Sequence, residues 1–288
     1  MARAILKAPR NTPAAALLGD LGWSELKCTH DKIKAKFFSR LKNMDLNRWP
    51  KLLLNALFIV SNQSGRNLSW KWLDSIGNIL SENNLSSMFN ANSEINETWL
   101  NTFNHTHDQF VSDNWYDSAS QKSSLDLYIK FKKSPYLERY LLDKLDFYGA
   151  SLKFKARSNT LPVERKLSSW DPSNDGICLL CKEEIEDVTH FMLKCKSLDN
   201  IRNMELTNLK NNLCMSGYGF IWNEFSSSVT ANQLSFILGS YALNSISYLP
   251  IESCSEIDNI FDMYCKSYLK HAWSIRANLK SGSQSVIT

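Results

Sequence analysis

The chain has 288 residues, which at roughly 100–200 residues per domain predicts two domains or one large domain with appendages. Apolar residues make up 43% and charged residues 22%, and the net charge is a mild +4. This composition argues against a disordered, collagen-like or membrane-bundle protein. Ten Gly and seven Pro are few for the many turns of a barrel or sandwich, so we expect a mainly α, irregular helical assembly.

Three helical patterns and a polar region make up the first part of the chain. We expect helices over about 12–21, with Pro13 at its start, and over 31–44, with one apolar face. The apolar run at 50–60 indicates a buried helix. Residues 61–125 are polar and rich in Asn and Ser, which predicts short helices joined by loops.

The second part of the chain is also helical in pattern. Ser134 and Pro135 begin an apolar-periodic segment that predicts one long helix from Pro135 to about Phe154. Residues 168–176 have the composition of a turn-forming connector. After Cys195 we expect three helices, the last beginning with a capping box at Ser255, over about 197–213, 230–247 and 255–279.

Metal-ligand residue types cluster between residues 178 and 195, with the spacing Cys-x2-Cys-x8-His-x4-Cys. Two Cys three positions apart can bring both thiolates to one ion through a tight turn. Three thiolates and one imidazole are a common closed ligand set for structural zinc. The sequence therefore predicts one structural zinc ion held by Cys178, Cys181, His190 and Cys195.

The alternative for these four positions is a set of ordinary buried residues, which their clustering argues against. Residues five apart on an α-helix point about 140° apart, so His190 and Cys195 cannot share one stripe in the middle of a helix. One of the two should lie at a helix end. The other cysteines have no such partners and are expected to be small core residues: Cys28, Cys214, Cys254 and Cys265.

Other candidate sites are weaker. His105 and His107 alternate in a polar stretch and are expected in a solvated loop, and His271 is expected on a helix surface or in packing. No phosphate loop, dinucleotide fingerprint, nucleophile elbow or zinc-deaminase pattern occurs. The chain shows no secretory signal and no run of 18 apolar residues. Its seven cysteines are odd in number and unevenly spread, which does not fit a disulfide framework. We therefore expect an intracellular protein without a membrane segment, in the nucleus or the cytoplasm.

Positive charge is concentrated in two blocks. Residues 1–60 contain 11 Lys and Arg against 4 Asp and Glu, and residues 130–166 contain 10 against 4, whereas the remaining segments are acidic. Such asymmetry indicates a polyanion-binding face or, alternatively, basic helices that pair with acidic ones inside the fold. Trp170 or Phe154 could stack on bases. The candidate phosphate contacts just before the Cys pair are Lys153, Lys155, Arg157, Arg165 and Lys166.

Several features between Lys153 and Arg202 form a recognisable pattern. In order, they are Phe154–Pro162, the pair Cys178 and Cys181, Glu186–Phe191, Cys195 and Arg202. This pattern resembles the zinc-binding region near the C-terminus of many non-LTR (LINE-like) retrotransposon polyproteins. The N-terminal region looks like the end of the polymerase thumb and the segment that follows it in such proteins, on the basis of Arg3–Leu6, Asn11–Pro13 and Leu21–Trp23.

The resemblance implies a C-terminal remnant or derivative of a reverse transcriptase protein that binds RNA or DNA, with any polymerase supplied by another chain. No Tyr/Phe-x-Asp-Asp motif and no nuclease carboxylate set occur, so we expect no enzyme activity in this chain. The predicted parts are a post-thumb helical region over 1–129, a basic helix with the zinc module over 130–215, and C-terminal helices over 216–288. The alternative function is a structural or protein-interaction zinc module without nucleic-acid contact.

Overall fold

The computed structural model describes residues 1–63, 71–89, 97–143, 145–240 and 249–284. Helices dominate these residues, which confirms the mainly α prediction. Within them, extended pairing is confined to an isolated antiparallel bridge between Ile177 and Ile185. None of the helices in this described part is long and apolar enough to cross a membrane.

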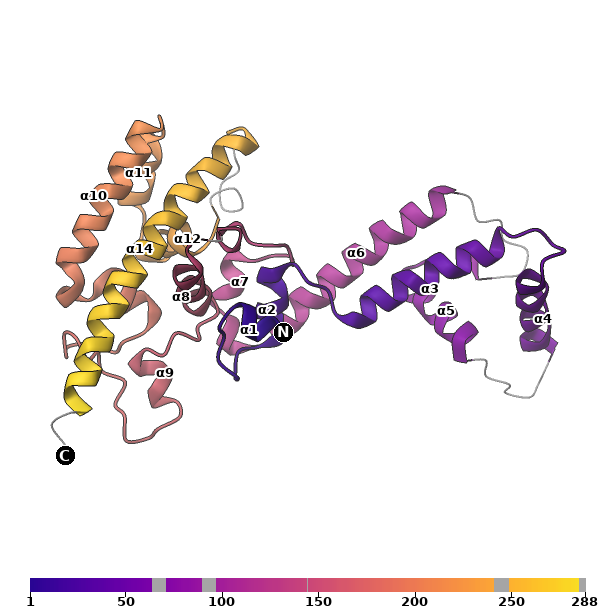
Figure 1. Ribbon diagram of the computed structural model, residues 1–288, viewed down its shortest axis with the longest axis horizontal. Helices are drawn as coiled ribbons and strands as arrows, with labels where there is room; N and C mark the ends of the chain where they lie inside the picture. The colour runs from indigo at the N-terminus through magenta and orange to yellow at the C-terminus, as the bar shows by residue number, and fades with distance from the viewer. Residues whose placement is uncertain (64–70, 90–96, 144, 241–248, 285–288) are drawn as a thin grey trace. The chain divides into compact units, whose positions relative to one another are not determined.

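The chain forms two compact units (Figure 1). The first unit combines residues 1–23 with residues 118–288, and the second unit consists of residues 24–117. Helix α6 (Glu97–Ser120) contains the point at which the chain passes from the second unit to the first. The boundaries predicted from the sequence, after residues 129 and 215, both fall inside the first unit. The division into two units therefore does not coincide with the three predicted parts.

The α-helices described in the second unit are α3 (Leu26–Lys42), α4 (Trp49–Gln63), α5 (Lys71–Glu82) and most of α6. Phe38 of α3 is fully buried, and its ring contacts those of Phe58, Phe89 and Trp99. Because α5 and α6 run for 12 and 24 residues, the prediction of short helices over 61–125 was wrong there.

Helix α4 differs from its predicted burial. Leu54 and Phe58 enter the core of the second unit, but Leu53 and Ile59 keep more than half of their surfaces exposed. A continuous apolar run has no 3.6-residue periodicity that marks one face of the helix. The run therefore predicted a helix but not which of its residues are buried. In this structure α4 is half-buried rather than enclosed.

The first unit begins with α1 (Ala2–Ile5) and α2 (Ala14–Leu21). Helix α2 ends in a left-handed Gly22, whose φ is 62°, because the chain must turn back where the backbone of Leu137 approaches too closely for a side chain. Pro13 is the N-cap of α2 rather than its first helical residue, so the helix begins one residue later than predicted.

A buried polar network joins α2 to residues more than 100 positions later. The Asp20 carboxylate accepts hydrogen bonds from Tyr128 and Tyr140 and pairs with the Arg157 guanidinium at 3.1 Å. Arg157 Nη2 also donates to Glu138 at 2.7 Å, and Lys132 donates to the same carboxylate oxygen at 2.7 Å. The side chains of Asp20, Arg157 and Lys132 are no more than 1% exposed. Two acids and two bases therefore balance each other inside the unit.

The predicted long helix from Pro135 to Phe154 is two separate elements. Residues 132–138 are not helical, a 3₁₀ turn follows at Arg139–Leu141, and α8 (Phe147–Arg157) begins only after Asp146. Asp146 accepts a hydrogen bond from the Gly149 amide at 3.0 Å, which makes it the N-cap of α8. Helix α7 (Tyr128–Phe131) lies before this segment.

The C-terminal helices are α10 (Asp199–Met215), α11 (Gly219–Ser227), α12 (Thr230–Leu238) and α14 (Ile251–Gln284). Helix α14 packs along both α10 and α8 (Figure 1). Ser255 lies inside α14 and donates to the Ile251 carbonyl, so the predicted capping box is not the start of this helix. Helix α11 was not predicted, and part of the segment predicted at 230–247 lies outside the described residues.

Candidate metal centre

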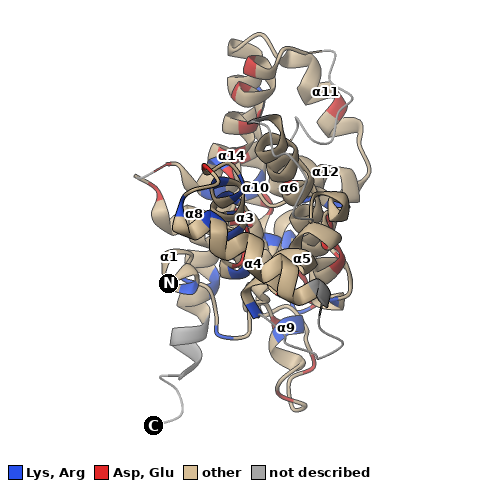
Figure 2. Ribbon diagram, turned by 90° about the vertical axis from the view of Figure 1, so that its right-hand side faces the viewer, with Lys and Arg blue, Asp and Glu red and all other residues tan. Residues whose placement is uncertain are grey.

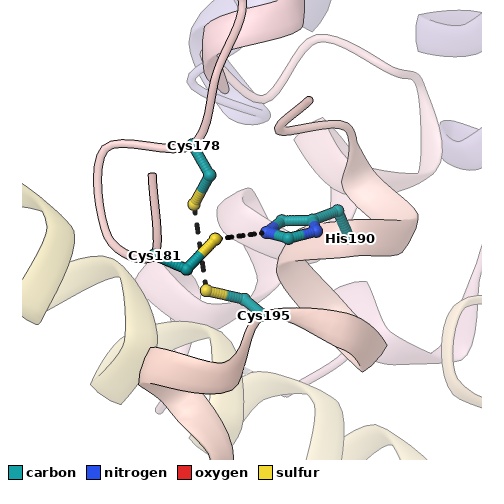
Figure 3. Close-up of side chains that lie close together, drawn as sticks. All are labelled: Cys178, Cys181, His190 and Cys195. Carbon is teal, nitrogen blue, oxygen red and sulfur yellow. Dashed lines mark hydrogen bonds between the residues drawn. The ribbon is translucent and has the colours of Figure 1, made fainter. Parts of the chain in front are cut away.

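The four predicted metal ligands come together in the structure (Figure 3). One ligand atom from each of Cys178, Cys181, His190 and Cys195 lies within 4.8 Å of the other three. The sulfurs of Cys178 and Cys195 are 3.8 Å apart, and Cys181 Sγ lies 3.4 Å from His190 Nε2. The group can therefore hold one metal ion.

A tight turn presents the first two cysteines. The Lys182 amide donates to the Cys178 carbonyl at 2.9 Å, and Lys182 has a left-handed φ of 57°. The Cys178 amide donates to the Glu184 carbonyl and the Glu186 amide to the Gly176 carbonyl, which closes a short antiparallel loop around the turn. This loop explains how a spacing of three residues brings both sulfurs to one side.

Backbone amides point at the cysteine sulfurs. Burial raises the pKa of Cys178 to about 12, even though the amides of Cys181 and Leu180 favour its thiolate. Burial likewise raises the pKa of Cys195. At Cys181 burial opposes ionisation, but hydrogen bonds from the amides of Glu183 and Glu184 and from the thiols of Cys178 and Cys195 together hold the pKa of this thiol below its ordinary value. Buried thiols with amide donors are the arrangement that a bound cation would complete.

His190 and Cys195 lie at the two ends of one turn, as their spacing required. His190 is the first residue of the π-helix η4 (His190–Lys194), and Cys195 is the residue that ends it. The Cys195 amide donates to the His190 carbonyl at 2.8 Å, which is the i to i+5 bond of a π turn. His190 Nδ1 lies 3.2 Å from Glu184 Oε2, so the carboxylate orients the ring with Nε2 toward the cysteines.

A buried ion-pair network, which the sequence reasoning missed, lies behind Cys178. Glu186 Oε1 is 3.7 Å from Cys178 Sγ, and Arg276 of α14 contacts both oxygens of Glu186 at 2.9–3.1 Å. Arg276 also contacts Glu164 of α9 (Glu164–Ser168) at 2.6 Å. Charge pattern alone could not reveal this network, because Arg276 is 90 residues from Glu186 in the sequence.

Two more side chains fasten the ligand loop to the C-terminal helices. Arg202 donates to the carbonyls of Cys195, at 2.8 Å, and of Met192, at 3.1 Å. The Tyr268 hydroxyl donates to the Phe191 carbonyl at 2.7 Å. Arg202 was part of the recognised sequence pattern, and in the structure its guanidinium holds the backbone of the last ligand.

The five predicted phosphate contacts lie in different environments. Lys153 pairs with Asp262 at 3.0 Å, and Arg157 belongs to the buried network, so burial argues against phosphate contact by either side chain. Lys155 is partly exposed, and Arg165 and Lys166 lie on α9 with access to solvent. Nucleic-acid contact by these three residues stays a prediction.

The remaining histidines and cysteines are outside the cluster. His107 lies within α6 rather than in a loop, is 2% exposed and stacks on Phe103, so that prediction was wrong. His271 is a helix-surface residue beside Glu205, as expected. Cys254 and Cys265 are buried, whereas Cys214 is exposed and is not a core residue.

Comparisons with known proteins give no match from which the role of this site could be transferred. No family model, curated protein or solved structure matches the chain.

Proposed function

We propose that the chain is a zinc-stapled module that binds RNA or DNA and has no catalytic centre of its own. The observation that carries the zinc assignment is the spacing of the four ligand atoms. With Zn–S near 2.3 Å and Zn–N near 2.0–2.1 Å, a tetrahedron has S–S edges of about 3.8 Å and S–N edges of about 3.5 Å. The separation of 3.8 Å between the Cys178 and Cys195 sulfurs and that of 3.4 Å between Cys181 Sγ and His190 Nε2 match two of these edges, and all four ligand atoms lie within 4.8 Å of one another.

The donor set supports zinc in a structural role. Three soft thiolate sulfurs and one imidazole suit zinc better than a hard cation that prefers oxygen ligands. All four positions of a tetrahedron are filled by protein, which leaves none for a reacting water. Bound zinc would supply the positive charge that stabilises the buried thiolates, and it would tie the loop at 176–186 to η4.

Exposed cations beside the metal loop support nucleic-acid binding. Arg165, Lys166 and Lys130 line a groove of about 540 Å³, together with Val188 and Thr189 just before His190. Asp126 and Asp187 also line this groove, and Asp187 lies 3.5 Å from Arg165 at the exposed end of both side chains. The Lys166 ammonium lies 5.7 Å from the ring centre of Trp170, which is 55% exposed. Cations that neutralise phosphates beside an aromatic that stacks on bases form a recurrent nucleic-acid-binding arrangement.

The resemblance to non-LTR retrotransposon proteins extends this proposal. It supports an origin of the chain as a C-terminal remnant or derivative of such a reverse transcriptase protein, which would act next to a polymerase in another chain. A primer-extension assay with the purified chain tests the proposed lack of polymerase activity directly.

A structural or protein-interaction module is the second candidate, and one observation favours it. Many basic residues pair with acidic residues inside a unit: Lys32 with Asp108 in the second unit, and Lys132 and Arg157 with Glu138 in the first. Such pairing uses positive charge for folding rather than for phosphate binding.

One set of measurements tests the zinc assignment. The purified chain should contain one zinc per molecule, and Cys181→Ser should lower this value and increase hydrogen exchange over residues 176–202, because binding and local folding are coupled. Cys214→Ser removes an exposed cysteine outside the cluster and should change neither quantity. Absence of zinc from the wild type, or full zinc content in Cys181→Ser, would contradict the assignment.

A second measurement separates the two candidate functions. Binding to a fluorescent oligonucleotide should weaken steeply as salt rises if the chain neutralises phosphates. A purely structural module would show no binding at low salt.

A further inference from the structure

The first unit brings one lysine from each basic block of the sequence close together, Lys7 from the first block and Lys155 from the second. Lys7 follows α1, and Lys155 lies in the last turn of α8. The Ser151 hydroxyl donates to the Leu6 carbonyl at 3.1 Å, which holds the end of α1 against α8. Figure 2 marks the Lys and Arg positions along the ribbon in blue and the Asp and Glu positions in red.

The charges of these two lysines are not neutralised locally. Partial burial lowers the pKa of Lys155, and the positive charge of Lys7 lowers it further, while no carboxylate contributes to the shift. In the described ranges neither lysine forms an ion pair, unlike Lys153 and Arg157 of the same helix. Two neighbouring ammonium groups without a counter-charge favour binding of an anion.

The backbone fixes the position of Lys7. The Ala8 amide donates to the Arg3 carbonyl at 2.9 Å and the Lys7 amide to the Ala4 carbonyl at 3.3 Å, which together form a Schellman motif at the end of α1. Lys7 occupies the left-handed position of that motif, with a φ of 46°, where glycine is usual. Its ammonium lies 5.0 Å from the centre of the Phe147 ring.

Two aromatic side chains lie along the same helix. Phe147 is 42% exposed and Tyr148 is 51% exposed, and they are eight and seven positions before Lys155, so both border the helix face that ends in Lys155. Asp146, next to them, is already paired with Lys270 at 2.8 Å. We call Lys7, Phe147, Tyr148 and Lys155 the α1–α8 surface.

We propose that the α1–α8 surface binds single-stranded nucleic acid, with Lys7 and Lys155 on phosphates and the two aromatic rings on unstacked bases. This proposal rests on the proposed function and places binding at residues outside the groove of α9. A single strand is favoured over a duplex because only unpaired bases expose their faces to aromatic rings.

The test is a salt titration of binding to labelled oligo(U) and oligo(dT), and to a duplex of equal length, with the full zinc-loaded chain. Lys7→Ala/Lys155→Ala should reduce the log–log salt slope by about 1.4, at ~0.7 for each phosphate contact on a single strand. The matched control Lys27→Ala/Lys36→Ala removes two exposed lysines of α3 in the second unit and should leave the slope unchanged.

The aromatic contribution has its own variant. Phe147→Leu/Tyr148→Leu keeps apolar bulk at two half-exposed positions, so it should fold, but it should weaken single-strand binding by about fivefold or more without changing the slope. Phe147→Trp/Tyr148→Trp should retain binding. Circular dichroism and zinc content should be the same in all variants.

The outcomes separate this surface from the general function. If the wild type binds and both lysine double variants behave alike, the α1–α8 surface is not the site, although the proposed function stands. If the leucine variant binds as tightly as the wild type, or the duplex binds as tightly as a single strand, base stacking here is refuted. If the wild type does not bind at low salt, nucleic-acid binding itself fails.

Discussion

Arg157 offers the sharpest test of whether basic residues in this chain serve the fold or a ligand. The sequence suggested a phosphate contact, but the guanidinium is 1% exposed and contacts Asp20 and Glu138. We expect Arg157→Met to destabilise the first unit, because methionine fills similar space but leaves two buried carboxylates with Lys132 as their cation. Breaking a buried ion pair from one side costs about 3–5 kcal/mol. For a domain of this size, that loss corresponds to a fall in Tm of about 6–20 °C.

The pH dependence gives this prediction a sign. Burial alone would raise the pKa of Asp20, but Arg157, Lys132 and two tyrosine hydroxyls outweigh it, and the pKa lies below its ordinary value. Asp20 therefore stabilises the wild type above about pH 4, its unfolded-state value, and this stability is lost as the pH falls further. Without Arg157 the pKa of Asp20 should rise, so that protonation relieves the buried charge. The cost of the substitution should then be larger at pH 7 than at pH 4.

Chemical denaturation at the two pH values, followed by circular dichroism, measures this difference. Arg165→Met is the matched control, because Arg165 is 65% exposed and its ion pair with Asp187 at 3.5 Å should contribute at most about 1 kcal/mol. A loss below about 1 kcal/mol for Arg157→Met, or a loss of equal size at both pH values, would refute the reasoning.

Two further predictions concern packing. Tyr268→Phe should cost about 1 kcal/mol and loosen the ligand loop, because the Tyr268 hydroxyl donates to the Phe191 carbonyl. Tyr264→Phe should be neutral or stabilising, because the buried Tyr264 hydroxyl has no hydrogen-bond partner among the described residues. Thermal unfolding of both variants measures the difference. Phe38→Ala should cost about 3–5 kcal/mol in the second unit, and hydrogen exchange should rise over the described residues of 24–117 while zinc content stays unchanged. Loss of zinc in Phe38→Ala would show that the two units are not independent.

The metal ligands were predictable because their chemistry is local. All four lie within 18 residues, and the spacing of Cys178 and Cys181 defines a turn whatever surrounds it. The need for a helix end between His190 and Cys195 also followed from geometry alone, although the π turn that provides it did not. That the bound metal is zinc is our proposal, based on the three thiolates and one imidazole.

The burial of charged residues was not predictable in the same way. Lys153, Lys155 and Arg157 occupy alternate positions of one helix and have the same charge, yet only Lys155 faces solvent. Their difference comes from Asp262 and Asp20, which are more than 100 residues away in the sequence. A count of positive charges records the sign of a segment, but it does not record which distant acids will meet it. The same lack of long-range information hid the link between Glu186 and Arg276.

The discontinuity of the first unit has a consequence for the order of folding. Asp20 is made 137 residues before its partner Arg157, and at about 5–20 residues per second a ribosome needs about 7–27 s to cover that distance. During this interval the whole of the second unit, residues 24–117, is synthesised and has its own core to collapse around. A folded insert shortens the free chain between Trp23 and Ser118, which reduces the entropy lost when the two parts of the first unit meet. Helices α1 and α2 therefore cannot complete their contacts until the rest of the first unit has been synthesised. If synthesis stopped before residue 132, the Asp20 carboxylate would lack both Lys132 and Arg157.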